Sequence, residues 1–249
     1  MAVTIFTLYS NRPDFIKFQK ESFEKYLKDD YKWIIINNHG YLYDKTEEIE
    51  QECIEQGIEY LTVEHEREIE VSQLVANSLN FLWQAQASKR KGIVVIMDSD
   101  LFLTSDVSFA DVLGQSDMFF CPQYTEGHIW PWPGFVGFNM EKIKADDVSF
   151  ELLKIGDKYS DVGSGLNKYI EKYQPKIKLI DRKEITDQDW PVPNTNQTLH
   201  QLGFPKPYSV DFLPFAFHYK TGSNYAKHCT SEYNQAKTES LLKILYGTH

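Results

Sequence analysis

Residues 93–100, Ile-Val-Val-Ile-Met-Asp-Ser-Asp, place two aspartates directly after a run of five apolar residues. Five consecutive apolar residues predict a strand buried on both faces of a sheet. Asp98 and Asp100 follow that strand, and because side chains alternate along an extended chain, both carboxylates point to the same side. Two carboxylates beside a buried strand require a cation or hydrogen bonds to offset their charge. A hard divalent cation with oxygen ligands, which can also bridge to phosphate oxygens, meets this requirement.

The first half of the chain alternates strand and helix patterns. Strands are expected at 3–9, 33–36, 59–63 and 92–97, and helices at 13–28, 45–56 and 71–87. Apolar strands separated by helices predict an α/β fold with a mainly parallel central sheet flanked by helices. Ligands of such sheets gather at the carboxyl ends of the strands, which is where Asp98 and Asp100 lie.

The second half is less regular. Strands are expected at 117–121, 134–139 and 176–180, helices at 148–155, 163–173 and 232–246, and non-strand connections at 122–133 and 186–208. The longer connection, rich in Pro, Asn and Gln, exceeds what compact domains usually carry without a function. A single domain over residues 1–249 is expected, with one half at about 1–103 and the other at about 104–249, closed by the C-terminal helix.

Composition excludes several classes of protein. The 249 residues are 42% hydrophobic and 25% charged, which is ordinary for a globular protein. The net charge of −10 and the lack of a basic patch argue against a nucleic-acid partner. Cys53, Cys121 and Cys229 match no zinc or disulfide framework, which favours a reducing, cytoplasmic compartment. No signal peptide is expected, and no apolar stretch is long enough to span a bilayer.

The segment from Ala76-Asn77 to Asp98-Ser99-Asp100 resembles the GT-A glycosyltransferases, in which an Ala/Arg-Asn helix precedes a strand ending in Asp-x-Asp. The resemblance implies a Rossmann-like GT-A fold and a nucleotide-sugar donor, expected to carry uridine. It implies that Asp98 and Asp100 hold Mn²⁺ or Mg²⁺ against the donor diphosphate, with Ser99 and Asn77 nearby. Residues 1–103 then bind the nucleotide sugar and residues 104–249 the acceptor. Because Asn77 is preceded by Ala and not by Arg, a basic contact to the diphosphate is expected from elsewhere.

The resemblance extends to the ends of the first two strands. Residues 7–12, Thr-Leu-Tyr-Ser-Asn-Arg, are similar to the family's nucleoside-binding loop. This implies that the nucleoside is contacted by Thr7, Tyr9, Asn11 and Arg12. Asn38, at the end of the second strand, lies where the family often has an acidic or amide contact to the base.

Residues 215–225 form a second informative stretch, in which an apolar strand delivers His218. The segment is similar to the late His, Gly and Lys of many GT-A enzymes, which implies that His218 is a third metal ligand and that Lys220 and Gly222 lie near the phosphates. Imidazole suits Mn²⁺ better than Mg²⁺. Lys220 would offset the charge of the departing diphosphate. The alternative is that His218 is a hydrogen-bonded structural residue.

The acceptor side has two candidate features. Trp130 or Trp132 either stacks on a sugar face or forms a Trp-Pro turn against the core. Asp161, at an expected helix start, is the candidate catalytic base that would deprotonate the acceptor, a glycan or another hydroxyl compound, in an inverting reaction. The alternative for Asp161 is a helix N-cap. Asp157 and Asp189 are weaker candidates for the base.

Three other functions compete with the glycosyltransferase. A phosphohydrolase of the haloacid dehalogenase type also has an apolar strand before Asp-x-Asp, but it expects Thr or Val where this chain has Leu101. A sugar nucleotidyltransferase needs a Gly-rich loop after the first strand, and residues 10–13 contain no Gly. A non-catalytic carbohydrate-binding protein fits the 14% aromatic content but leaves the carboxylate pair without a purpose. Residues 187–189 repeat the Asp-x-Asp pattern, so only its position after the fourth strand gives the pattern weight.

Overall fold

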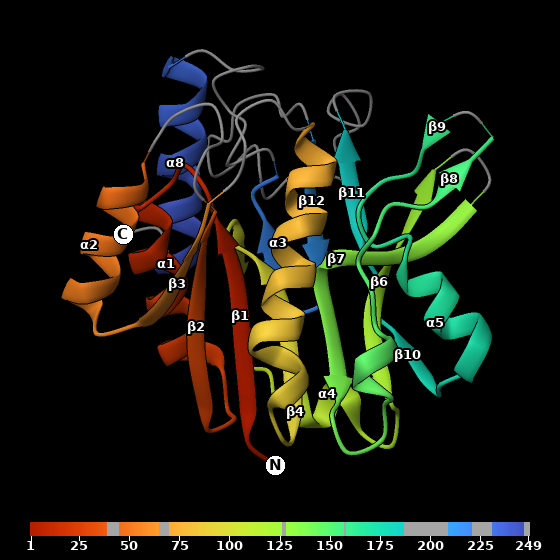
Figure 1. Cartoon of the computed structure of the whole chain (residues 1–249). Coiled ribbons are helices and arrows are strands. Elements are labelled where there is room, and N and C mark those ends of the chain that lie inside the picture. Colours follow the sequence, from red (N-terminus) through yellow and green to blue (C-terminus); the bar gives the residue numbers. More distant parts are fainter. Residues whose placement is uncertain are drawn as a thin grey trace.

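The computed structural model describes residues 1–38, 45–64, 70–125, 128–156, 158–186, 209–220 and 231–246. At its centre is a seven-stranded sheet in the order β10-β6-β7-β4-β1-β2-β3 (Figure 1). The strands are β1 (Val3–Tyr9), β2 (Tyr31–Asn38), β3 (Glu59–Val63), β4 (Ile93–Asp98), β6 (Met118–Thr125), β7 (His128–Asn139) and β10 (Ile177–Leu179). Only β7 runs against the other strands of this sheet, so the predicted mixed, mainly parallel sheet is confirmed.

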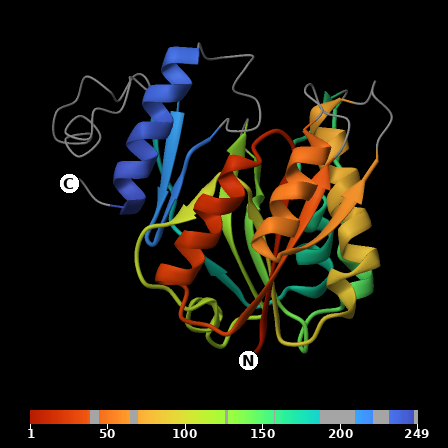
Figure 2. The same cartoon turned by 90° about the vertical axis from the view of Figure 1, so that its left-hand side faces the viewer.

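Helices cover both faces of the central sheet (Figures 1 and 2). One face packs against α1 (Asp14–Tyr26), α2 (Thr46–Gln56) and α4 (Phe109–Leu113). The C-terminal helix α8 (Ser231–Tyr246) contributes to the same core, and Lys25 Nζ of α1 bonds the carbonyl of Leu245 in it. The other face packs against α3 (Val71–Ala85) and α5 (Leu166–Tyr173). The alternation of β1 explains this division, because Ile5 contributes to the first core and Phe6 to the second. No helix in the described part of the chain is long and apolar enough to cross a membrane.

A second, four-stranded antiparallel sheet lies beside the first, in the order β11-β12-β13-β5. Its strands are β5 (Leu101–Leu103), β11 (Lys183–Thr186), β12 (Ser209–Leu213) and β13 (Ala216–His218). The sequence predicted only β13. Since β5 follows Asp100 directly and pairs with β13, His218 lies opposite Leu101. The amide of Tyr219 also donates a 2.8 Å hydrogen bond to the carbonyl of Asp100. This small sheet therefore joins the two stretches that the sequence singled out.

The prediction of a non-strand connection at 122–133 is wrong, because β6 and β7 form one long hairpin through most of it. Pro122 lies opposite Pro131, and neither residue has an amide to donate to the ladder at this point of the hairpin. An irregularity between Phe120 and Cys121 shifts the register of the hairpin. The hairpin extends the sheet beyond the ends of its neighbours and forms one wall of the site described below.

The predicted helix at 148–155 is also wrong. Val148 and Phe150 both enter the second core, which is the spacing of an extended chain. The amide of Phe150 bonds Asn80 Oδ1 at 2.8 Å, and that of Leu153 bonds Ser160 Oγ at 3.0 Å, so side chains replace the helical acceptors. The segment leads into a small hairpin of β8 (Lys154–Ile155) and β9 (Lys158–Tyr159). The predicted connection at 186–208 lies outside the described residues after Thr186.

Candidate functional site

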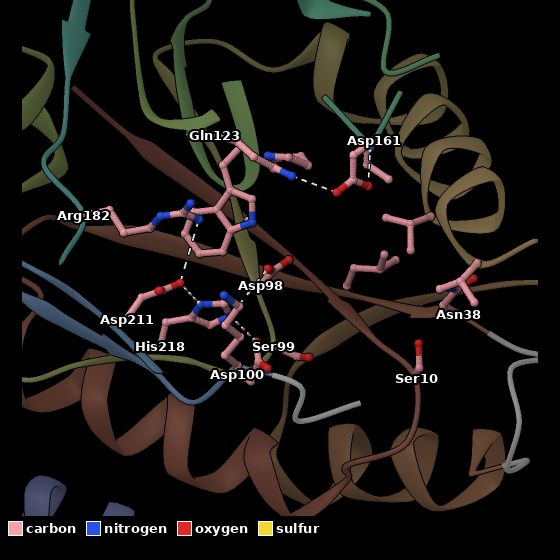
Figure 3. A pocket seen from close by; sticks show the side chains of 18 of the residues that line it. Ser10, Asn38, Asp98, Ser99, Asp100, Gln123, Asp161, Arg182, Asp211 and His218 are labelled. Atoms are coloured by element: carbon pink, nitrogen blue, oxygen red, sulfur yellow. Dashed lines mark hydrogen bonds and ion pairs between the residues drawn. The ribbon is translucent and has the colours of Figure 1, made fainter. Parts of the chain in front are cut away.

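A cavity of about 440 Å³ opens at the carboxyl ends of the central parallel strands (Figure 3). Leu8 and Ser10 line it from the end of β1, Asn38 from β2, and residues 98–100 from the turn between β4 and β5. The N-terminal turns of α3 and the β6–β7 hairpin complete its walls. The cavity therefore lies at the sheet edge where the sequence placed the site.

Asp98, Asp100 and His218 come together on the floor of this cavity, as predicted. One potential ligand atom from each lies within 4.8 Å of the others. His218 Nε2 is 3.1 Å from Asp100 Oδ1 and 4.0 Å from Asp98 Oδ2. Two atoms bound to one ion at about 2.0–2.6 Å can lie up to about 5 Å apart. The geometry is therefore compatible with a three-residue divalent cation site.

The three side chains perturb one another's protonation. Burial alone would lower the pKa of His218, but the charge and hydrogen bond of Asp100, together with those of Asp211, raise it to about 9. Burial and the neighbouring Asp100 charge raise the pKa of Asp98 to about 7. The Asp98 side chain is 40% exposed and lines the cavity. Without a cation, the cluster therefore retains protons, and these protons offset carboxylate charge that a bound cation would otherwise offset.

The cavity carries an excess of negative charge. Its described carboxylates are Asp98, Asp100, Asp161, Glu184 and Asp211, whereas its described permanent cations are Arg182 and Lys220. An anionic ligand such as a diphosphate would be repelled by this arrangement unless it arrived with a cation. The electrostatics thus disfavour an anion that arrives alone and favour one that arrives with a cation.

Trp132 and Gly134 of β7 shape the wall beside the cluster. The Trp132 ring lies 4.7 Å from the His218 ring, and the Arg182 guanidinium lies 4.9 Å from the Trp132 ring centre. A Cβ atom at Gly134 would lie 2.2 Å from both Asp98 Oδ2 and the Trp132 ring. A glycine is therefore required for Asp98 to keep its place. Trp130, the alternative stacking residue, is buried and does not line the cavity.

Asp161 lies across the cavity from the cluster (Figure 3). Its carboxylate accepts hydrogen bonds from Gln123 Nε2 at 2.7 Å, the Val162 amide at 2.7 Å and Ser72 Oγ at 3.3 Å. It does not cap α5, which begins only at Leu166. The structure thus places Asp161 in the site. Asp157 and Asp189 lie outside the described residues.

The predicted nucleoside contacts from β1 require a correction. Thr7 and Tyr9 are fully buried on the opposite face of the sheet from the cavity. Thr7 Oγ1 accepts from Trp33 Nε1 at 2.8 Å, and Tyr9 Oη donates to Gln19 Oε1 at 2.9 Å. Alternation along the strand places Leu8 and Ser10 in the cavity in their stead.

The next two predicted contacts also point elsewhere. The Arg12 guanidinium bonds Asp14 at 2.6 Å and stacks 3.6 Å from the Phe15 ring centre, and its side chain is only 8% exposed. Asn11 is buried, and neither it nor Arg12 lines the cavity. Arg12 thereby stabilises the turn between β1 and α1.

Asn38 does line the cavity. Its Oδ1 accepts a 2.8 Å hydrogen bond from Ser78 Oγ, which fixes the amide. Its Nδ2 is buried and has no partner among the described residues. Asn77 does not line the cavity, and its Oδ1 accepts from Gln73 Nε2 at 2.8 Å. The contribution of α3 to the cavity comes from Val71, Leu74 and Val75.

Of the remaining predicted residues, Ser99 and Lys220 line the cavity. Ser99 lies in the cavity wall within the Asp-x-Asp turn. Lys220 also lines the cavity, where its Nζ is 2.5 Å from Glu184 Oε1. Gly222 lies outside the described residues. Sequence reasoning missed Arg182 and Asp211, which both line the cavity and lie 3.8 Å apart.

Comparisons with known proteins give a limited set of similarities. No family model matches the chain, and no curated protein matches its sequence. Its fold is similar to a crystal structure of S. aureus TarS at a TM-score of 0.46 and 13% identity, over 72% of this chain and 35% of that chain. Residues 1–349 of TarS in complex with UDP also match at 0.46 and 13%, over 76% of this chain and 62% of that chain. The complex of the same piece with UDP-GlcNAc matches at 0.46 and 13%, over 72% and 56%. The chain thus spans less than two thirds of each of these structures.

Proposed function

We propose that this protein is a divalent-cation-dependent glycosyltransferase that moves a sugar from a nucleoside-diphosphate donor, expected to be a UDP-sugar, to an acceptor hydroxyl. The observation that carries this proposal is the cluster of Asp98, Asp100 and His218 on the floor of a cavity at the carboxyl edge of an α/β sheet. Such an edge is where open α/β sheets bind their ligands.

The sheet topology supports a nucleotide ligand. In the order β4-β1-β2-β3, β1 lies between β2 and β4. From β1 the chain moves to β2 and then β3 on one side, and it returns to the other side of β1 to form β4. The strand order therefore reverses beside β1, and open α/β sheets bind nucleotides in the crevice at such a point. Leu8 and Asp98 stand on the two sides of that crevice. The unpartnered Nδ2 of Asn38 could donate to a carbonyl of the base.

The residues fit a divalent cation. Two carboxylates and one imidazole provide hard and borderline donors within reach of one ion, and this set favours Mn²⁺ over Mg²⁺. When bound, the cation would offset the charge of the diphosphate leaving group. Lys220 and Arg182 are the described cations that could offset the remaining charge, and Arg182 would then supply the basic contact that the sequence expected from elsewhere.

Asp161 is proposed as the base. Its three donors hold the carboxylate across the cavity from the cluster, where an acceptor hydroxyl would approach the anomeric carbon from the side opposite the diphosphate. In this proposal Asp161 accepts the hydroxyl proton as the new glycosidic bond forms and the nucleoside diphosphate departs, which inverts the anomeric centre. Trp132 offers an aromatic face for the sugar.

The proposal is tested by donor turnover. In Mn²⁺, the protein should hydrolyse or transfer from at least one UDP-sugar, and Asp100→Ala should abolish this turnover while circular dichroism shows an intact fold. Full activity of the folded variant would contradict the metal assignment. Cleavage of a phosphate monoester with no donor turnover would favour the phosphohydrolase instead.

A further inference from the structure

Three charged or titratable side chains form one row across the small sheet. In the antiparallel register, Glu184 of β11 lies opposite Asp211 of β12, and Asp211 lies opposite His218 of β13. Directly opposite residues project from the same face of a sheet. All three line the cavity, with His218 at the end of the row beside Asp100.

Asp211, the middle residue of this row, is within hydrogen-bond distance of the His218 ring. Asp211 is fully buried, and its Oδ2 is 2.9 Å from His218 Nδ1. The other ring nitrogen, Nε2, faces Asp100 Oδ1 at 3.1 Å (Figure 3). A carboxylate can only accept a hydrogen bond, so the two contacts call for a hydrogen on Nδ1 towards Asp211 and one on Nε2 towards Asp100. A cation at the cluster would take the place of the Nε2 hydrogen, whereas the Nδ1 hydrogen stays bonded to Asp211. In the neutral ring, Nε2 is then the atom with the free lone pair.

The geometry assigns Asp211 as a positioning residue for the cation site. It holds the imidazole of His218 in the tautomer and orientation that direct the Nε2 lone pair at the point shared with Asp98 and Asp100. This inference rests on the proposed function and deepens it, because it names a residue that acts on the cation through His218. Carboxylates that accept from the distal nitrogen of a ligating histidine fix its orientation and increase its basicity.

Two further contacts fit this assignment. Arg182 Nη1 lies 3.8 Å from the same Oδ2 atom, so the buried carboxylate has a counter-charge without losing its contact to His218. The Trp132 ring contacts both cationic neighbours of Asp211: it lies 4.7 Å from the His218 ring and 4.9 Å from the Arg182 guanidinium. The imidazole is thereby bonded at Nδ1 by Asp211 and packed against the tilted ring of Trp132.

The first experiment is a titration with Mn²⁺ alone, followed by electron paramagnetic resonance of the free ion. Wild-type protein should bind Mn²⁺, and Asp211→Asn should bind it about 10–100-fold more weakly, as second-sphere substitutions do. Glu184→Gln is the matched control, because it removes one charge from the neighbouring position in the same row without touching His218. The control should bind Mn²⁺ nearly as well as the wild type.

The outcomes distinguish the cation site itself from the positioning role of Asp211. If the wild type does not bind Mn²⁺, the proposed metal site itself is contradicted. If the wild type binds but Asp211→Asn binds equally well, only the positioning role is overturned. Equal weakening of Mn²⁺ binding by Asp211→Asn and Glu184→Gln would also overturn the positioning role, because the effect would then come from the loss of one negative charge in the cavity.

A second measurement needs no substitution at Asp211. ¹⁵N chemical shifts of the histidine rings, recorded on the wild-type protein with Zn²⁺ as a diamagnetic probe, report which ring nitrogen carries hydrogen. The His218 signals are assigned by their loss in His218→Gln. Hydrogen on Nδ1 with the cation on Nε2 supports the assignment, and the reverse tautomer contradicts it.

Discussion

Asp161 is the residue whose chemical role is most open to direct testing. It touches neither Asp98 nor His218 within hydrogen-bond distance among the contacts of the described chain, yet it lines the same cavity. Asp161→Asn keeps the shape of the side chain and removes its ability to accept a proton. We expect kcat to fall by about 10²–10⁴-fold, the usual contribution of a general base.

The Mn²⁺ affinity and the KM for the donor should change far less in Asp161→Asn than kcat does. Gln123→Glu is a useful companion, because it removes one of the donors to Asp161 and adds a like charge. A kcat of Asp161→Asn close to that of the wild type would rule out Asp161 as the base.

Some residues of the site could be predicted from the sequence, and others could not. Asp98, Asp100 and His218 were identified because they follow apolar runs whose ends must reach the sheet edge. The predicted contacts from β1, Thr7 and Tyr9, each differ by one residue from Leu8 and Ser10, which line the cavity. Both faces of β1 are buried against helices, so its hydrophobic pattern contains no information on which face carries the cavity.

Arg182 and Asp211 had weaker signals. Asp211 interrupts the apolar sequence of β12, Ser-Val-Asp-Phe-Leu, and a buried carboxylate of this kind requires a partner. Its partner is seven residues further along the chain, across a hairpin that the sequence did not reveal. Arg182 lies between two short strands and has no distinguishing pattern.

At the scale of elements, β7 has two glycines that face different neighbours. A Cβ at Gly134 would lie 2.2 Å from Asp98 Oδ2, whereas a Cβ at Gly137 would lie 2.2 Å from the Phe119 ring in the core. Gly134→Ala should therefore displace Asp98 and weaken Mn²⁺ binding at least about tenfold, a change of about 1.4 kcal/mol in binding free energy. Calorimetric titration of the folded variant with Mn²⁺ measures this.

Gly137→Ala is the control for overpacking of the same strand. It should lower the free energy of unfolding by about 1–3 kcal/mol, as crowded cores do, while the folded fraction binds Mn²⁺ as the wild type does. If both variants lose the same amount of stability and Gly134→Ala keeps its Mn²⁺ affinity, the close approach at Gly134 does not serve the site.

Most elements of the first half were predictable because the helices are periodic and the strands between them are apolar runs bounded by turn residues. The strands β1 and β3 match the predicted ranges, and α2 ends at Gln56, followed by the C-cap Gly57, whose φ of 66° suits a glycine. The second half depends on contacts distant in sequence. The strands β5, β11 and β12 have three to five residues each, too few to display a period, and they form only because they pair with one another and with β13.

For the molecule as a whole, the cluster predicts how stability depends on pH without metal. The pKa of His218 rises from 6.5 to about 9 on folding, so its contribution is full below pH 6.5 and is lost as the pH rises through about 9. The pKa of Asp98 rises from 3.8 to about 7, so its contribution is likewise lost towards pH 7. In EDTA, the melting temperature should therefore fall between about pH 6.5 and pH 9.

Thermal melts across this range, with His218→Gln as the comparison, check the prediction. The variant should show a shallower fall in melting temperature between pH 6.5 and 9, since the titrating group is gone. Mn²⁺ should raise the wild-type melting temperature more at pH 9 than at pH 6, because protons then compete less for the ligands. Parallel curves for the two proteins in EDTA would contradict the assignment of this pH dependence to His218.

The central claim is that a cation and a nucleoside diphosphate bind this cavity together. Isothermal titration of the wild-type protein with UDP, with and without Mn²⁺, tests it most directly, with Asp100→Ala as the comparison. We expect UDP to bind the wild type in Mn²⁺, its affinity to fall sharply in EDTA, and Asp100→Ala to show no gain from Mn²⁺. UDP binding of equal strength with and without the cation would contradict the claim, as would the absence of UDP binding in Mn²⁺.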